Sequence, residues 1–124
     1  MQLTIIEQEF SVCKVSDYSE VTLEDPWVFI GSTNQEKSLV CPTSKVPKNV
    51  IKCEEGWRAF RIEGILDFSL IGILSRITSI LADHKIGIFA ISTYNTDYIL
   101  TKKESFDHAI EVLKAEGYTI NNAG

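Results

Sequence analysis

The sequence has few of the residues that build covalent or metal frameworks. It contains three cysteines, and none of them has the C-x-x-C spacing of a zinc or redox motif. We therefore predict neither a disulfide framework nor a zinc site, and we interpret Cys13, Cys41 and Cys53 as buried or idle thiols. No cluster of His, Asp and Glu has the spacing of metal ligands. We expect no metal and no cofactor.

Positive charge and long apolar runs are also scarce. Twelve Lys and Arg oppose seventeen Asp and Glu, for a net charge of -5 at pH 7, and no basic run is interleaved with aromatics. A nucleic-acid partner is therefore not expected. The apolar runs are far shorter than the roughly 20 residues that span a bilayer, and the start MQLTIIEQEF lacks the pattern of a signal peptide. We expect a soluble, cytoplasmic protein without a membrane partner.

The second half of the chain begins with a strand pattern followed by a helix pattern. Residues 57–62 predict a strand, with Phe60 and Ile62 on one face and the charged residues Arg61 and Glu63 on the other. Apolar residues then recur every three or four positions from Leu70 to Leu81, which predicts an amphipathic helix packed on a sheet. Gly87 is the expected C-terminal stop of this helix.

The remainder of this half predicts a hairpin, a second helix and a last strand. The stretches IFAISTY and DYILTK are separated by Asn95 and Thr96, which favours a tight hairpin. Ser105 is the predicted cap of a helix that ends at Gly117, and YTI forms the last strand. The predicted buried face of this helix contains Phe106, Ala109, Ile110 and Leu113. The order favours a ferredoxin-like (βαββαβ) α+β unit, with a four-stranded antiparallel sheet and both helices on one face.

The first half repeats parts of the second. FSVCKVSDYS (10–19) matches FRIEGILDFS (60–69) at an offset of fifty, and VFIGSTNQEKSLV (28–40) matches IFAISTYNTDYIL (88–100) at an offset of sixty. About ten residues are therefore missing where the second copy has its first helix, and EVTLEDPW remains as a stub. We predict a degenerate half at 1–56 and a complete domain at 57–124, forming one compact body.

The second copy resembles the ACT domain, a small ligand-sensing module. The resemblance is carried by LDFSLIGILSRITSILADHKIGIFAISTYNTDYILT, in which the acid, the glycine, the helix and the hairpin fall in the family's order. The stretch ISTYNTDYIL resembles sequences of the tandem-ACT group, which includes CASTOR-type amino-acid sensors. The resemblance is good over 57–120 and weak over 1–56. Ile71 departs from the pattern, since many members have proline there.

The resemblance and the residue types together predict a ligand site. Unpaired amides at a helix N-terminus favour a carboxylate, and Gly72 permits close approach, which suits an amino acid. Asp67 and Asp97 can pair with a cation, and hydroxyls at Ser92 and Thr93 can bind a polar ligand. In ACT proteins such ligands lie at a contact between domains or subunits. The predicted site contains Asp67, Phe68, Ser69, Leu70, Ile71, Gly72, Ile73, Ser92, Thr93, Asn95, Thr96 and Asp97.

Each of these residues also has a structural interpretation. Asp67 can cap the helix, Gly72 can serve helix–sheet packing, and STYNTD can be a hairpin with hydrogen-bonding turn residues. Two functions therefore stand: a regulatory protein that binds a small molecule, an amino acid in particular, or an interaction module for an unknown protein partner with a vestigial ligand site. ACT-like sheets commonly pair, so we expect a homodimer in either case.

Signals for catalysis are weaker than signals for binding. His84 and His108 have no serine or cysteine nucleophile pattern around them. The loop ILDFSLIG is acidic and contains no arginine, unlike the phosphate loops of small ferredoxin-like phosphatases. We therefore expect no enzyme activity and no catalytic residue.

Overall fold

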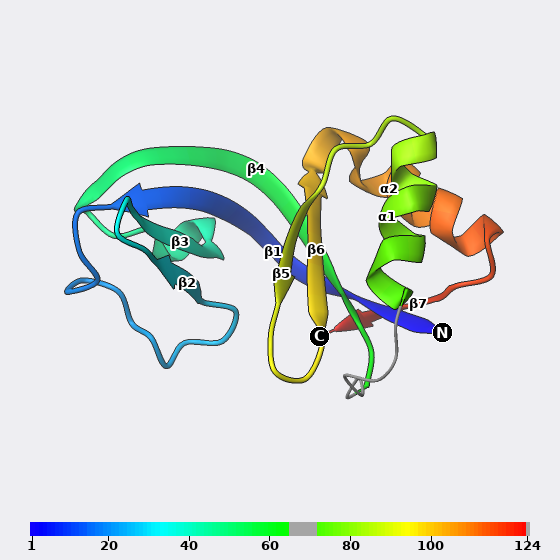
Figure 1. Cartoon of the computed structure of the whole chain (residues 1–124), viewed down its shortest axis with the longest axis horizontal. Helices are drawn as coiled ribbons and strands as arrows, with labels where there is room; N and C mark the ends of the chain where they lie inside the picture. Colours follow the sequence, from blue (N-terminus) through cyan, green and yellow to red (C-terminus); the bar gives the residue numbers. More distant parts are fainter. Residues whose placement is uncertain (65–71, 124) are drawn as a thin grey trace. The chain divides into compact units, whose positions relative to one another are not determined.

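The computed structural model describes residues 1–64 and 72–123. These residues form strands and helices in the order drawn in Figure 1. The elements are β1 (Gln2–Val15), β2 (Phe29–Ser32), β3 (Lys37–Pro42), the 3-10 turn η1 (Thr43–Lys45), β4 (Val50–Ile62), α1 (Ile73–Asp83), β5 (Phe89–Ser92), β6 (Asp97–Lys102), α2 (Lys103–Ala115) and β7 (Thr119–Ala123).

The chain packs as two compact units. The C-terminal unit comprises Met1–Glu7 and Arg58–Gly124, and the inserted unit comprises Gln8–Trp57. The long strands β1 and β4 therefore each supply residues to both units. The first seven residues belong to the C-terminal unit although they precede the inserted unit in the sequence.

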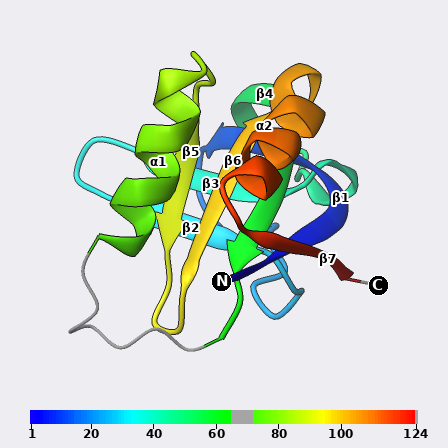
Figure 2. The same ribbon diagram turned by 90° about the vertical axis from the view of Figure 1, so that its right-hand side faces the viewer.

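The C-terminal unit has the predicted ferredoxin-like α+β architecture. Its elements follow the order β4, α1, β5, β6, α2, β7, and both helices cover one face of the sheet (Figure 2). The helices and the strands share one apolar core, because each helix presents a stripe of apolar residues to the sheet. This core contains Leu3, Phe60, Ile62, Ile77, Ile80, Leu81, Ile86, Ile99, Phe106, Ala109, Ile110 and Leu113. The predicted buried face of the second helix is confirmed.

The sheet of this unit differs from the predicted four-stranded antiparallel sheet. Its strand order is β7-β1-β4-β6-β5, so the start of β1 lies between β7 and β4. Residues Gln2 to Ile6 pair in parallel with β7, and Thr119 N–H donates to the Met1 carbonyl at 3.0 Å. Leu3 is fully buried as a result. The prediction was wrong because it assigned all of residues 1–56 to the first half and gave residues 2–6 no place in the sheet of the second.

Both helices end in a Schellman motif, which sets the path of the chain after each helix. At the end of α1, Lys85 has a φ of 60°, and Ile86 N–H donates to the Leu81 carbonyl. At the end of α2, Gly117 has a φ of 100° and plays the part that Lys85 plays after α1. The predicted stop at Gly117 is confirmed. The predicted stop at Gly87 is wrong, because Lys85 itself takes the left-handed conformation two residues earlier.

Two other predicted boundaries need correction. Helix α2 begins at Lys103 directly after β6, with Glu104 in its first turn, so Ser105 lies inside the helix and does not cap it. No loop separates the strand from the helix. The hairpin closes at the pair Ser92 and Asp97, so the turn has four residues where two were predicted.

The inserted unit repeats the hairpin of the C-terminal unit without its helices. Strands β2 and β3 pair in the same register as β5 and β6, sixty residues later. Thr33 N–H donates to the Glu36 carbonyl at 2.9 Å, and Thr93 N–H donates to the Thr96 carbonyl at the same distance. Described residues 16–28 form turns in place of α1, and η1 stands sixty residues before the start of α2. The inserted unit therefore shares the hairpin register of the C-terminal unit and has turns where that unit has α1.

The inserted unit has a small core of its own. It is formed by side chains from β1 and β3, with partly buried residues of the turns packed against them. The fully buried members are Cys13, Val15, Leu39 and Cys41. Among the described residues of the whole chain, neither helix is long and apolar enough to cross a membrane.

Candidate ligand-binding site

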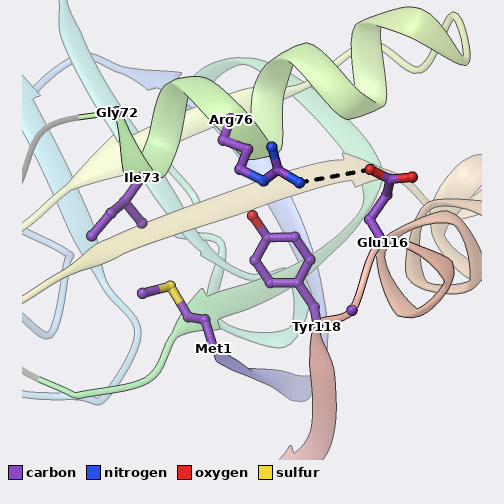
Figure 3. Close-up of a pocket in the computed structure, with 7 residues that line it drawn as sticks. Met1, Gly72, Ile73, Arg76, Glu116 and Tyr118 are labelled. Atoms are coloured by element: carbon purple, nitrogen blue, oxygen red, sulfur yellow. Dashed lines mark ion pairs between the residues drawn. The ribbon is translucent and has the colours of Figure 1, made fainter.

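An open pocket of about 400 Å³ lies in the C-terminal unit where α1 begins and α2 ends (Figure 3). Its volume falls in the range of small-molecule sites. The Schellman motif after α2 turns the chain at Gly117, and the pairing of β7 with β1 brings Tyr118 beside Met1. The pocket is lined by Met1, Gly72, Ile73, Arg76, Glu116, Gly117 and Tyr118.

The N-terminus of α1 gives this pocket hydrogen-bond donors and partial positive charge. Gly72 caps the helix with a φ of 82°, and Arg76 N–H makes the first intrahelical bond to the Gly72 carbonyl at 2.8 Å. Gly72 has no side chain that could accept bonds from the first amides of the helix. Such amides lack intrahelical acceptors and favour an anion. The left-handed conformation also explains why glycine stands at this position.

Opposite charges meet across the pocket. The guanidinium of Arg76 on α1 lies 3.8 Å from the carboxylate of Glu116 after α2, as Figure 3 shows. Both side chains are open to solvent, with 64% of Arg76 and 47% of Glu116 exposed. An ion pair this exposed contributes at most about 1 kcal/mol to stability. A charged ligand can therefore replace either partner at little energetic cost.

The rest of the lining is largely apolar. The side chains of Met1 and Ile73 flank the pocket, and the phenol of Tyr118 points toward α1 (Figure 3). A tyrosine offers an apolar ring and a hydroxyl that can donate or accept a hydrogen bond. The pocket thus combines a cation, an anion, helix amides and apolar surface. That combination can hold a small zwitterion with an apolar or polar side chain.

The structure brings some of the predicted site residues to this pocket. Gly72 and Ile73 both line it. The hairpin residues Ser92, Thr93, Asn95, Thr96 and Asp97 are not among its lining residues. A further part of the predicted site lies outside the described residues, namely Asp67, Phe68, Ser69, Leu70 and Ile71.

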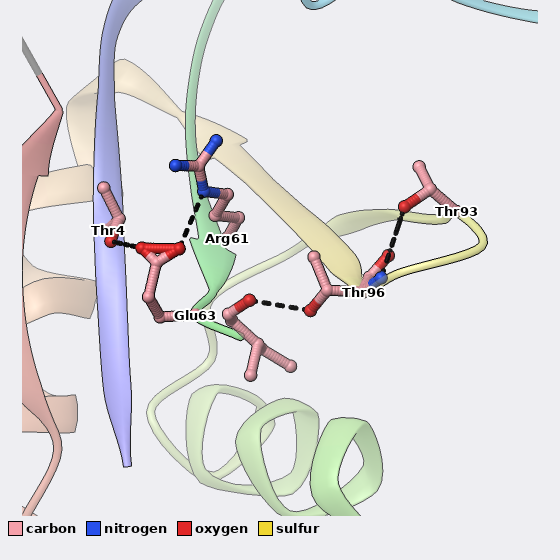
Figure 4. A network of polar contacts seen from close by, with 6 residues as sticks. Thr4, Arg61, Glu63, Thr93 and Thr96 are labelled. Atoms are coloured by element: carbon pink, nitrogen blue, oxygen red, sulfur yellow. Dashed lines mark hydrogen bonds and ion pairs between the residues drawn. The ribbon is translucent and has the colours of Figure 1, made fainter. Parts of the chain in front are cut away.

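The hydroxyls of the hairpin are engaged within the fold. Ser92 Oγ donates to Asp97 Oδ1, and Thr93 Oγ1 donates to the Thr96 carbonyl at 2.8 Å. Thr96 is 8% exposed, and its hydroxyl donates to the Ile62 carbonyl at 2.7 Å, which fastens the turn to the end of β4 (Figure 4). The first two bonds lie within the hairpin, and the third joins it to β4.

A second polar network lies on β1 and β4 (Figure 4). Thr4 Oγ1 donates to Glu63 Oε2 at 2.6 Å, and Arg61 Nε donates to Glu63 Oε1 at 3.2 Å. The Thr4 hydroxyl, and then the charge of Arg61, hold the pKa of Glu63 below its usual value. Glu63 N–H also donates to the Gln2 carbonyl. This network joins the start of β1 to β4 and has a structural role.

Sequence reasoning missed three chemically important pocket residues. Arg76 lies four residues after Gly72, and residues at this spacing share one face of a helix. The spacing could therefore have identified Arg76 as a neighbour of Gly72. Glu116 and Tyr118 reach the pocket only through the packing of α2 and β7. No local spacing in the sequence identifies them.

The two histidines also come together in the fold. The rings of His84, at the end of α1, and His108, on α2, lie edge to face with centroids 5.9 Å apart. His84 Nδ1 lies 3.0 Å from the Ile80 carbonyl. Among the described residues, no group of three or more His, Cys, Asp or Glu side chains could hold a metal ion.

Comparison with known proteins identifies the family. The sequence profile of the ACT domain matches residues 52–115, which is more than half of the chain. The chain belongs to the ACT domain family. ACT domains are typically regulatory domains that bind ligands. No curated protein sequence shows a significant match.

Solved structures share the fold of this ACT protein. A protein from Agobacterium tumefaciens is 24% identical with a TM-score of 0.86, covering 99% of this chain and 93% of that one. The ligand-free regulatory subunit of Thermus thermophilus aspartate kinase is 7% identical with a TM-score of 0.60, covering 89% and 93%. The aspartate kinase of Clostridium acetobutylicum is 12% identical with a TM-score of 0.66, covering 88% of this chain but only 33% of the kinase.

Proposed function

We propose that this ACT protein is a regulatory protein that binds a free amino acid in the pocket at the start of α1. The observation that supports this most is the meeting of Arg76, Glu116 and the α1 N-terminus around one space of about 400 Å³. The α-carboxylate would bind Arg76 and the first amides of α1, and the ammonium would bind Glu116. The side chain of the amino acid would lie against Ile73 and Tyr118.

The family and the fold support a regulatory role for this pocket. The similar structures include the regulatory subunit of the Thermus thermophilus aspartate kinase. They also include the Clostridium acetobutylicum aspartate kinase, which is described as an allosteric enzyme. We propose by extension that amino-acid binding here biases the contacts of the ACT protein with another subunit. The proposal contains no chemical step, so the amino acid should be recovered unchanged after incubation with the protein.

A melting series with each of the twenty amino acids tests the proposal. A ligand at a hundred times its dissociation constant adds about 2.7 kcal/mol to the free energy of unfolding, which raises the melting temperature by several degrees. We expect one amino acid, or a few of similar side-chain chemistry, to produce this shift. If none of the twenty does, the remaining function is an interaction module with a vestigial ligand site.

We also propose that the ACT protein is a homodimer. Arg76 and Glu116 are exposed around an open pocket, so a bound amino acid would stay partly in water unless a second copy covered it. Two-fold dimers are the commonest closed assembly. Light scattering at micromolar concentration should give twice the monomer mass of 13.9 kDa, and a mass of 13.9 kDa with and without amino acid would contradict the proposal.

A further inference from the structure

Two cysteines that are forty residues apart in the sequence meet in the inserted unit. Cys13 lies on β1 and Cys53 lies on β4, and these strands are neighbours in the sheet. The Cys13 thiol donates a hydrogen bond to the Cys53 sulfur, with the two sulfur atoms 3.4 Å apart. Cys13 is only 4% exposed, whereas Cys53 is exposed to solvent. Cys53 is therefore the member of the pair that solvent reaches, and Cys13 is buried beside it.

We propose that Cys13 and Cys53 are a reversible oxidation site that forms a disulfide by exchange with a small disulfide such as oxidised glutathione. A disulfide bond is about 2.05 Å long and joins residues whose Cα atoms are about 4.4–6.8 Å apart, a spacing that adjacent strands provide. The sulfurs already touch, so the bond requires side-chain rotation and little movement of the backbone. The site is independent of the amino-acid pocket, because both cysteines belong to the inserted unit.

The exchange proceeds in two balanced steps. The exposed Cys53 loses its proton to solvent, and its thiolate attacks one sulfur of the glutathione disulfide, which releases one glutathione thiolate and leaves a mixed disulfide on Cys53. The Cys13 sulfur then loses its proton and attacks the Cys53 sulfur, which releases the second glutathione. Both released thiolates take up protons. Two protein thiols are oxidised and one small disulfide is reduced to two thiols.

The third cysteine provides an internal control. Cys41 lies on β3, is 1% exposed, and has a pKa raised to about 11 by burial. Small disulfides cannot reach it in the folded chain. Burial, and then the hydrogen bond to Cys53, also raise the pKa of Cys13, so the exposed Cys53 is the thiol expected to attack the small disulfide first.

Thiol counting and peptide mapping test this inference. The folded full-length chain is incubated with oxidised glutathione, quenched with acid and alkylated in denaturant. The number of free thiols should fall from three to one. The peptide map should show Cys13 linked to Cys53, and dithiothreitol should break this link. Retention of all three thiols, a lasting glutathione adduct without the link, or a link to Cys41 would overturn the proposal.

Single substitutions separate the roles of the cysteines. Cys13→Ser should stop at the glutathione adduct on Cys53, and Cys53→Ser should keep both remaining thiols. Cys41→Ser is the matched control, because Cys41 is buried like Cys13. This variant should form the Cys13–Cys53 link as the wild type does. Cooperative melting of each variant is checked first. The peptide map of the wild type decides the question even if a variant fails to fold.

Discussion

Leu3→Ala is expected to lower the free energy of unfolding of this ACT protein by about 2–5 kcal/mol, the usual cost of emptying a fully buried leucine site. Leu3 is fully buried among the helix residues of the C-terminal core, although it stands at the very start of the chain. The strand that carries it lies between β4 and β7. Loss of this side chain therefore weakens the middle of the sheet. Urea unfolding followed by circular dichroism measures the effect.

An exposed leucine provides the matched control for this experiment. Leu23 is 56% exposed, so Leu23→Ala should change the free energy of unfolding by less than about 0.5 kcal/mol. If Leu3→Ala is as mild as Leu23→Ala, the first strand does not belong to the C-terminal core. The placement of β1 between β4 and β7 would then be wrong.

Arg76→Gln is expected to weaken amino-acid binding at least about tenfold, because a hydrogen bond to a charged group contributes roughly 1.5–3 kcal/mol. Arg76 is 64% exposed and pairs only loosely with Glu116, so the substitution should leave the melting temperature of the free protein nearly unchanged. Calorimetric titration with the amino acid that shifts the melting curve measures the affinity.

Lys85→Gln is the control for the loss of charge. Lys85 is exposed just beyond the other end of α1, so this variant loses the same unit of charge without altering the pocket. We expect wild-type affinity in Lys85→Gln. Equal affinity in Arg76→Gln and Lys85→Gln would remove Arg76 from the site.

Glu116→Gln distinguishes two roles of the carboxylate that faces Arg76. If Glu116 binds the ammonium of the ligand, affinity falls in this variant. If Glu116 only competes with the ligand for Arg76, affinity rises. Our proposal predicts the fall.

The architecture could be predicted from the sequence because its strongest signals are periodic. Apolar spacing located α1 and the buried face of α2, and Gly117 marked the end of α2. The sequence repeat at an offset of sixty coincides with two hairpins that have the same register. The helix signals are local in the sequence, and the repeat is visible when the sequence is compared with itself.

The parts that were missed depend on contacts between distant residues. The pairing of Gln2–Ile6 with β7 joins the two ends of the chain, and no local pattern specifies it. The same applies to the pocket, where Glu116 and Tyr118 meet Arg76 from another helix and strand. The contact between Cys13 and Cys53 was missed for this reason too, since it arises from neighbouring strands and not from spacing.

The most direct test of the proposed function is calorimetric titration of the wild-type chain with the amino acid selected by the melting series and with its carboxamide. The two ligands have the same side chain and ammonium, and only the first has a carboxylate for Arg76 and the α1 N-terminus. Our account predicts binding of the amino acid, and binding of the carboxamide at least about tenfold more weakly. Equal affinity for both, or no binding of any amino acid, would contradict it.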